Sequence, residues 1–158
     1  MQTHTTLYDH QRFMSQALLL AEQAYSEGEV PVGAVVVHNG MIIGKGYNQV
    51  ERLKDSSAHA EMIALSAAFE ARGSKYLKGC SIYVTLEPCP MCAGALVWSK
   101  IDRLIFGAID AEAGACGSVF NIAKNQKLNH RVEVIQGILE HDSEYLLKSF
   151  FQNKRKNL

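Results

Sequence analysis

The sequence predicts an α/β domain in which helices cover a mixed sheet. Two apolar runs, 32–38 and 41–47, flank Asn39-Gly40, a dipeptide typical of a tight hairpin turn. After this hairpin, strand-like and helix-like segments alternate, which favours strands connected by helices. At 158 residues with 47% hydrophobic residues, the chain has the size and composition of one domain with its own core.

The first half of the chain is predicted from helical periodicity and from residues that end helices. Apolar residues at helical spacing predict a helix over 7–27, and Gly28 is expected to end it. The polar segment 48–57 is predicted to be a loop. Ser56 or Ser57 is then expected to cap a helix from about His59 to Arg72, with Gly73 as its end.

The second half is predicted to alternate strands and helices. Strands are expected at 81–87, 103–110 and 132–136, and helices at 88–99, 119–124 and 143–154. The small, glycine-rich segment 111–118 is predicted to be a loop.

Composition indicates an intracellular protein. No stretch approaches the roughly 18–20 apolar residues of a membrane span, so we expect no membrane partner. The first ten residues lack the basic-then-apolar order of a signal peptide, which predicts a cytoplasmic location. In a reducing compartment, paired cysteines indicate metal or redox sites before disulfides.

Charge is unevenly distributed although the net charge is zero. Residues 1–117 carry 9 basic and 12 acidic residues, whereas 118–158 carry 7 basic and 4 acidic residues. The basic excess includes Lys124, Lys127, Arg131 and the terminal run 154–156. Such a cluster either contacts phosphates or forms a solvated helix end and tail.

The strings HAE (59–61) and PCPMC (88–92) are the most informative motifs. His59, Cys89 and Cys92 offer three zinc-type ligands, and Glu61 offers a carboxylate that is not needed as a ligand. Structural zinc sites use four protein ligands, whereas catalytic ones commonly use three and leave one position for water. The motifs therefore predict a catalytic zinc site. Taken alone, C-x-x-C also suits a redox pair or half of a structural zinc site.

H-x-E followed by P-C-x-x-C matches the signature of zinc deaminases. In that chemistry zinc lowers the pKa of its bound water toward about 7, and the water attacks the ring carbon that carries the amine. Glu61 is expected to take the water proton and pass it to a ring nitrogen, and then to help protonate the departing amine.

Five strings carry a more specific resemblance: VPVGAVVV (30–37), AHAEMIAL (58–65), YVTLEPCPMCAGAL (83–96), FGAIDAEAGACGS (106–118) and NHRVEVIQGIL (129–139). They resemble the bacterial tRNA adenosine deaminases. The resemblance covers about 8–155 and implies a single zinc deaminase domain over 1–158. It also implies a three-layer α/β/α fold of the cytidine-deaminase type with a mixed five-stranded sheet.

The resemblance implies wobble adenosine-to-inosine conversion in a tRNA anticodon stem-loop, by attack at C6, in a homodimer with one Zn²⁺ per subunit. It implies His59, Cys89 and Cys92 as ligands and Glu61 as the proton shuttle. The substrate-binding residues that it implies are Val30, Pro31, Asn48, Ala60, Leu86, Asp110, Ala111, Phe151, Lys154 and Arg155. An asparagine amide suits adenine, because it both donates and accepts hydrogen bonds.

The chain departs from the resemblance at Gln49-Val50, where a basic pair is expected, and at Asp55-Ser56-Ser57, where Asp-Pro-Thr is expected. Three alternatives stay open: a deaminase of a free base or nucleoside such as guanine or cytosine, a non-catalytic RNA- or zinc-binding module, and a C-x-x-C redox protein. DNA is not an expected partner. One phenylalanine of the pair 150–151 is expected in the core, and Trp98 and Met62 in the core or an interface.

Overall fold

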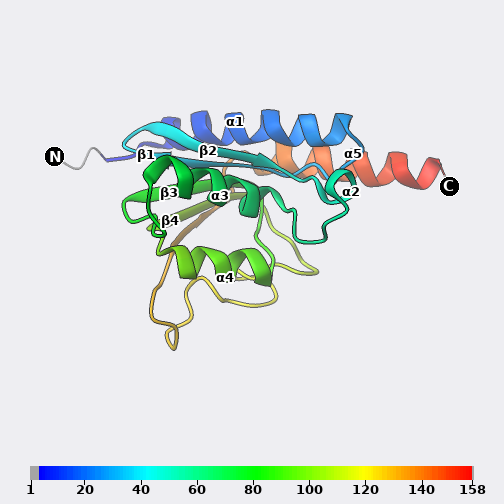
Figure 1. Cartoon of the computed structure of the whole chain (residues 1–158). Coiled ribbons are helices and arrows are strands. Elements are labelled where there is room, and N and C mark those ends of the chain that lie inside the picture. Colours follow the sequence, from blue (N-terminus) through cyan, green and yellow to red (C-terminus); the bar gives the residue numbers. More distant parts are fainter. Residues whose placement is uncertain (1–3, 158) are drawn as a thin grey trace.

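Five strands form one sheet in the order β2-β1-β3-β4-β5, as shown by a computed structural model that describes residues 4–157 (Figure 1). The strands are β1 (Gly33–His38), β2 (Met41–Tyr47), β3 (Cys80–Leu86), β4 (Arg103–Ala108) and β5 (Glu133–Gln136). β1 is antiparallel to β2 and β3, whereas β3, β4 and β5 are parallel. The predicted mixed five-stranded sheet is thus confirmed.

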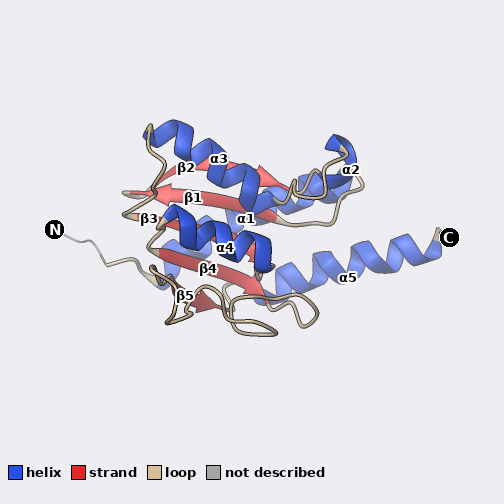
Figure 2. Cartoon of the chain, turned by 60° about the horizontal axis from the view of Figure 1, so that its bottom comes forward, coloured by secondary structure: helices blue, strands red, loops and turns tan. Residues whose placement is uncertain are grey.

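Helices cover both faces of this sheet. The helices are α1 (Leu7–Ser26), α2 (Val50–Leu53), α3 (Ala60–Arg72), α4 (Pro90–Ser99) and α5 (Glu140–Lys156). α1 and α5 lie on one face and α3 and α4 on the other (Figures 1 and 2). This arrangement confirms the predicted α/β/α layers. The C-terminal part of α5 projects beyond the sheet, on the side where the short α2 lies (Figure 2).

Each face of the sheet has its own core, because alternate residues of a strand point to opposite faces. Val35, Tyr83 and Ile105 pack with Phe13 and Met14 of α1. The strand residues that alternate with these point to the other face and pack toward α3 and α4. They are Val36, Ile82, Val84, Leu104 and Phe106. The two cores hold the sheet between rigid helical layers, so the strand ends are fixed positions for a site.

Two glycine-dependent features support the strand β2. Asn39 and Gly40 have φ of 50° and 75°, the left-handed pair that a two-residue hairpin turn requires, so the predicted hairpin is confirmed. A Cβ atom at Gly46 would overlap the backbone carbonyl of Ala60. The missing side chain therefore lets the first turn of α3 lie directly against β2.

Three predicted elements were wrong in detail. The segment 48–57 contains the short helix α2, whose first backbone N–H groups bond to a carboxylate from outside the segment. Residues 119–124 form no helix; Asn121 instead makes an isolated β-bridge with Cys116. α5 begins at Glu140, three residues before the predicted start.

The caps and aromatic residues also needed correction. Neither Ser56 nor Ser57 caps α3; its N-cap position is His59. Trp98 is 80% exposed, so core packing is excluded for it within this chain. One phenylalanine of the pair 150–151 is buried, as expected. Phe150 packs edge-on against Tyr25, whereas Phe151 is exposed. None of the described helices is long and apolar enough to cross a membrane.

A buried histidine predicts a pH-dependent stability. Nδ1 of His10 lies 2.8 Å from the Tyr83 hydroxyl, and burial raises the pKa of Tyr83 to about 12, so this hydroxyl stays protonated. Burial, together with the Arg103 charge, lowers the pKa of His10 below its usual 6.5. Just below pH 6.5, His10 therefore binds more protons in the unfolded chain than in the folded chain. The contribution of neutral His10 to the free energy of unfolding is complete above pH 6.5 and is lost as the pH falls through the folded-state pKa.

We expect His10→Gln to lose less unfolding free energy than the wild type between about pH 7.5 and about pH 5, because it has no imidazole to protonate. Chemical denaturation at both pH values measures the difference. An equal loss in the two proteins would contradict this role of His10.

Candidate active site

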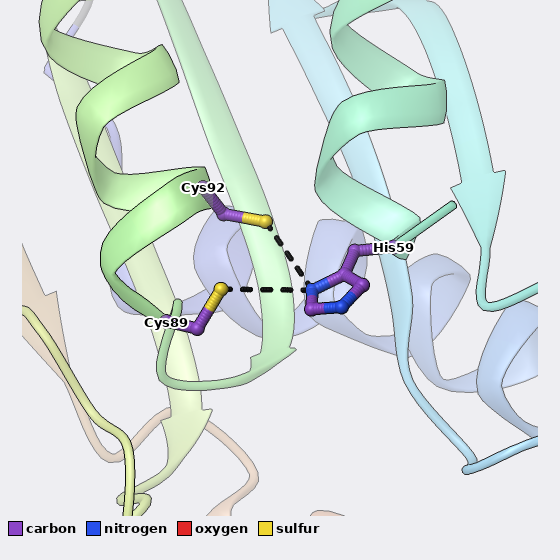
Figure 3. Close-up of side chains that lie close together, drawn as sticks. All are labelled: His59, Cys89 and Cys92. Carbon is purple, nitrogen blue, oxygen red and sulfur yellow. Dashed lines mark hydrogen bonds between the residues drawn. The ribbon is translucent and has the colours of Figure 1, made fainter. Parts of the chain in front are cut away.

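Three ligand-type side chains meet where the N-terminal ends of α3 and α4 lie side by side (Figure 3). His59 and Cys89 are the N-cap residues of α3 and α4, and Cys92 lies in the first turn of α4. Nδ1 of His59 lies 3.6 Å from Sγ of Cys89 and 3.5 Å from Sγ of Cys92. The i, i+3 spacing of the two cysteines places both sulfurs on one side of the helix, as predicted.

The geometry of these three atoms fits zinc. A tetrahedral zinc ion has Zn–S distances of about 2.3 Å and Zn–N distances of about 2.0–2.1 Å, which hold N and S about 3.5–3.6 Å apart. The observed N···S distances match, and all three donor atoms lie within 4.8 Å of one another. A set of one nitrogen and two sulfurs also suits zinc chemically, and it leaves a fourth tetrahedral position for a non-protein ligand.

The local electrostatics favour thiolate. A hydrogen bond from the Cys92 thiol, strengthened by His59, lowers the pKa of Cys89 to about 4. The same contact, together with burial, raises the pKa of Cys92. A divalent cation among these groups favours thiolate at both sulfurs, since it compensates the second negative charge. The contact with Cys89 is the main cause of the raised pKa of His59.

Glu61 lies beside the metal cluster without belonging to it. Its side chain is 4% exposed, and the group of ligand atoms that can share one ion contains His59, Cys89 and Cys92 but not this carboxylate. Burial raises the pKa of Glu61, which brings it closer to the neutral range in which a carboxyl exchanges protons efficiently. The carboxyl is therefore buried beside the three ligand-type atoms without being one of them.

A cavity of about 300 Å³ opens beside these groups. Its lining includes Glu61, His59 and Cys89, so the metal site and the carboxyl both face it. Five residues predicted from the sequence to bind substrate also line it: Val30, Asn48, Leu86, Asp110 and Lys154. Residues from the segment before β1, from α2, from the end of β3 and from α5 thus converge on one cavity, although they are far apart in the sequence.

The other five residues predicted to bind substrate do not line this cavity. Pro31 and Ala60 are buried and adjoin the lining residues Val30 and Glu61 in the sequence, and Ala111 is exposed on the loop after β4. Phe151 and Arg155 line a second hollow together with Lys148 and Glu112. Lys154 belongs to both linings, so the second hollow adjoins the first along α5.

Asn48 has a double role that the sequence did not indicate. Its Oδ1 accepts a hydrogen bond from the backbone N–H of Ala60 at 3.0 Å and so caps α3 from outside the helix. Among residues 4–157, its amide N–H groups have no protein partner, and the residue lines the cavity. The Asn48 amide is thereby held with its donors available to a ligand. Nearby, Val50 lines the cavity, and the Gln49 side chain accepts a hydrogen bond from Arg52.

Two buried carboxylates in the cavity lining were missed. Glu29, 2% exposed, accepts hydrogen bonds from the backbone N–H groups of Glu51 and Arg52 and so holds α2 at the cavity rim. Glu87, also 2% exposed, binds the loop that follows β4. Both glutamates are next to apolar or proline-containing segments, and that placement is the one signal of burial that the sequence offers.

The three α/β/α layers, together with a three-donor site for zinc beside a buried acid, are typical of a metal-dependent hydrolase. The family model described as the cytidine and deoxycytidylate deaminase zinc-binding region matches residues 7–108, which include all four motif residues. The chain therefore belongs to this deaminase family.

Relatives with named activities indicate which kinds of deaminase the chain is similar to. A tRNA-specific adenosine deaminase of Aquifex aeolicus is 51% identical over 146 residues, which cover 92% of this chain and 96% of the relative. A solved structure from work on A-to-I editing by tRNA:A34 deaminases at the wobble position has a TM-score of 0.83 at 40% identity, covering 86% of this chain and 99% of the other. A guanine deaminase of Nitrosomonas europaea has a TM-score of 0.74 at 25% identity, covering 89% and 83%.

Proposed function

We propose that this protein converts adenosine to inosine at the wobble position of a tRNA anticodon, with one zinc ion per subunit. The observation that carries the proposal is a three-donor metal site and a buried acid, Glu61, that face one cavity together with the amide of Asn48. The substrate class is supported by the identity to tRNA adenosine deaminases, which is twice the identity to the guanine deaminase.

In this proposal His59, Cys89 and Cys92 hold the zinc, which when bound lowers the pKa of a water molecule toward about 7 and so supplies a nucleophile at neutral pH. Glu61 accepts the proton released by that water and donates it to the ring nitrogen next to C6. It then takes the second proton of that water from the hydroxyl on C6 and gives it to the amine, which leaves as ammonia while C6 becomes a carbonyl carbon. Its raised pKa favours both transfers, because the carboxyl accepts and returns a proton with little cost.

The cavity size supports a single base as the group that enters. At about 300 Å³ it lies at the small end of ligand sites, so the base must leave its stacked position and be inserted alone. The Asn48 amide donates to an acceptor atom of the base, while Val30 and Leu86 provide apolar walls. Pro31 and Ala60 support these walls from behind.

Residues at the rim of the cavity and beyond it are proposed to bind the flanking nucleotides. Lys154 and Arg155 supply positive charge at the exposed end of α5, and Phe151, 41% exposed, offers a ring for stacking. Asp110 and Ala111 lie on the loop that faces this helix across the cavity rim. An anticodon stem-loop suits this arrangement, since its loop bases are unpaired and its phosphates are close together.

We also propose a homodimer of single-domain subunits, 1–158 with a core at about 8–155, that acts in the cytoplasm on RNA rather than on DNA. Support for the dimer comes from α4, where Met91 and Trp98 are both exposed and seven residues apart, hence on the same side of the helix. An exposed tryptophan beside a second large apolar side chain is typical of an interface.

The function is tested by incubating the purified protein with an anticodon stem-loop that has adenosine at the wobble position and, separately, with free guanine, cytosine and adenosine. We expect inosine in the stem-loop and no turnover of the free compounds. Turnover of a free compound alone would replace this proposal by the free-base alternative. Zinc without any turnover would favour a binding module.

Phosphate contacts of α5 predict a dependence on salt. We expect the double variant Lys154→Gln/Arg155→Gln to bind the stem-loop more weakly at low salt. The slope of log affinity against log salt should decrease in magnitude by about 1.4–1.8, since each of the two lost phosphate contacts contributes about 0.7–0.9. Fluorescence anisotropy over a salt series measures the slope. Unchanged slopes would assign these two residues to a solvated surface.

A further inference from the structure

The Glu87 carboxylate connects two parts of the site that are distant in sequence. Glu87 comes directly after β3 and directly before Pro88-Cys89. Its Oε1 accepts hydrogen bonds from the backbone N–H of Asp110 at 3.1 Å and from the Ser118 hydroxyl. Its Oε2 accepts from the backbone N–H groups of Cys116 and Ser118 at 3.0 and 3.1 Å. Four donors from the loop 110–118 thus converge on one buried side chain.

The partners of this carboxylate are all neutral. Among the described residues, no lysine, arginine or histidine forms an ion pair with Glu87. A carboxylate that is 2% exposed loses its hydration, and here backbone N–H groups and a hydroxyl replace that hydration. Because the bonds all come from one loop, their combined effect is to hold the conformation and position of that loop.

The backbone around Glu87 adapts to this role. A Cβ atom at Gly114 would overlap the Glu87 carboxyl group, so a residue without a side chain is required there. The backbone N–H of Ala115 donates to the carbonyl of Pro88 at 2.8 Å, and the N–H of Glu87 donates to the carbonyl of Ala108 at 2.8 Å. The loop 110–118 is therefore attached directly to the chain segment that leads into the zinc ligand Cys89.

The attachment matters for the cavity, since Asp110 and Ala113 of this loop line it next to Cys89 and Glu61. The loop thus forms part of the wall of the cavity that Asn48 and Val30 also line. If the loop moves, the distance between this wall and the metal ligands changes, while the ligands themselves remain held by α3 and α4.

We propose that Glu87 is a positioning residue that holds the loop 110–118 as a substrate-binding wall beside the zinc site, and thereby determines affinity for the RNA rather than the rate of the chemical step. The affinity part of this inference rests on the proposed function. The loop-holding part does not, because it concerns the protein without RNA.

The test uses Glu87→Gln in the full-length zinc-loaded protein. The amide keeps the size of the side chain but presents an NH₂ group to N–H donors, so part of the set of four bonds is lost. We expect faster backbone hydrogen exchange in 110–118, zinc near one per chain, KM for the stem-loop raised about tenfold and kcat changed less than about threefold. Glu70→Gln, an exposed glutamate on α3, is the matched control and should leave all four quantities unchanged.

A second variant, Gly114→Ala, tests the same contact from the loop side. Its methyl group would overlap both the Glu87 carboxyl and the backbone carbonyl of Asp110, so we expect the same faster exchange and the same rise in KM. Wild-type exchange in both variants, or a loss of kcat at unchanged KM, would overturn the proposal. If the wild type does not turn over the stem-loop, the proposed function fails; the exchange result still decides the loop-holding role, and KM is then measured on the compound that is turned over.

Discussion

Glu61→Gln is expected to lower kcat for deamination by about 10²–10⁴-fold while zinc stays near one per chain. Glutamine keeps the shape and burial of the side chain but cannot accept and return the two protons that the reaction transfers. The proposed metal ligands are His59, Cys89 and Cys92, and Glu61 lies outside their cluster, so we expect metal binding not to depend on its charge. Burial of the neutral amide avoids the cost of a charge, so folding is maintained.

The measurement is a single-turnover rate with the anticodon stem-loop, combined with metal analysis of the same sample. Glu70→Gln again provides the control, because Glu70 lies on α3 like Glu61 but is exposed and near the opposite end of that helix from the site. Substantial activity in Glu61→Gln would contradict the proton-shuttle role. A parallel loss of zinc would instead assign Glu61 to the metal site.

Cys92→Ala is expected to remove zinc and, with it, detectable deamination. Cys92 is fully buried and its sulfur lies 3.5 Å from Nδ1 of His59, so no other described side chain can replace this ligand without rearrangement of α4. Two remaining protein ligands hold zinc far more weakly than three. Since a bound metal stabilises the folded state, its loss should also lower Tm, by roughly 2–4 °C for each kcal/mol of stability removed.

Cys80→Ala is the matched control for this variant. Cys80 is also a fully buried thiol, and burial raises its pKa, but it lies at the start of β3, at the far end of the strand from Cys89. Both variants lose the same side-chain volume, so a shared decrease in Tm measures packing alone. We expect zinc and activity to remain in Cys80→Ala, and zinc retained by Cys92→Ala would contradict the three-ligand site. A chelator should reproduce the Cys92→Ala result in the wild type, and added zinc should reverse it.

Features that depend on neighbouring residues could be predicted from the sequence. The hairpin at Asn39-Gly40 follows from two residues that tolerate positive φ, and the end of α3 follows from Gly73. The pair Cys89 and Cys92 occupies one helical turn, so its geometry is decided locally. The helix predicted at 119–124 was wrong because its residues bond to the loop 114–117 instead of to each other.

Features that depend on residues far apart in the chain were decided by the tertiary structure. Asn48 caps α3 across the end of β2, Glu29 binds the start of α2, and Glu87 binds the loop 110–118. Each of these bonds joins residues 12 to 31 positions apart. Their existence depends on the sheet order and on helix packing, which no local pattern encodes.

The chemistry of this protein was therefore determined by its sequence alone, because the types and spacing of His59, Glu61, Cys89 and Cys92 already define a zinc site with an acid beside it. Only the tertiary structure decided the shape of the substrate cavity. Its walls come from segments that are adjacent in space and not in sequence, and buried carboxylates hold them there because each must find hydrogen-bond donors once it leaves water.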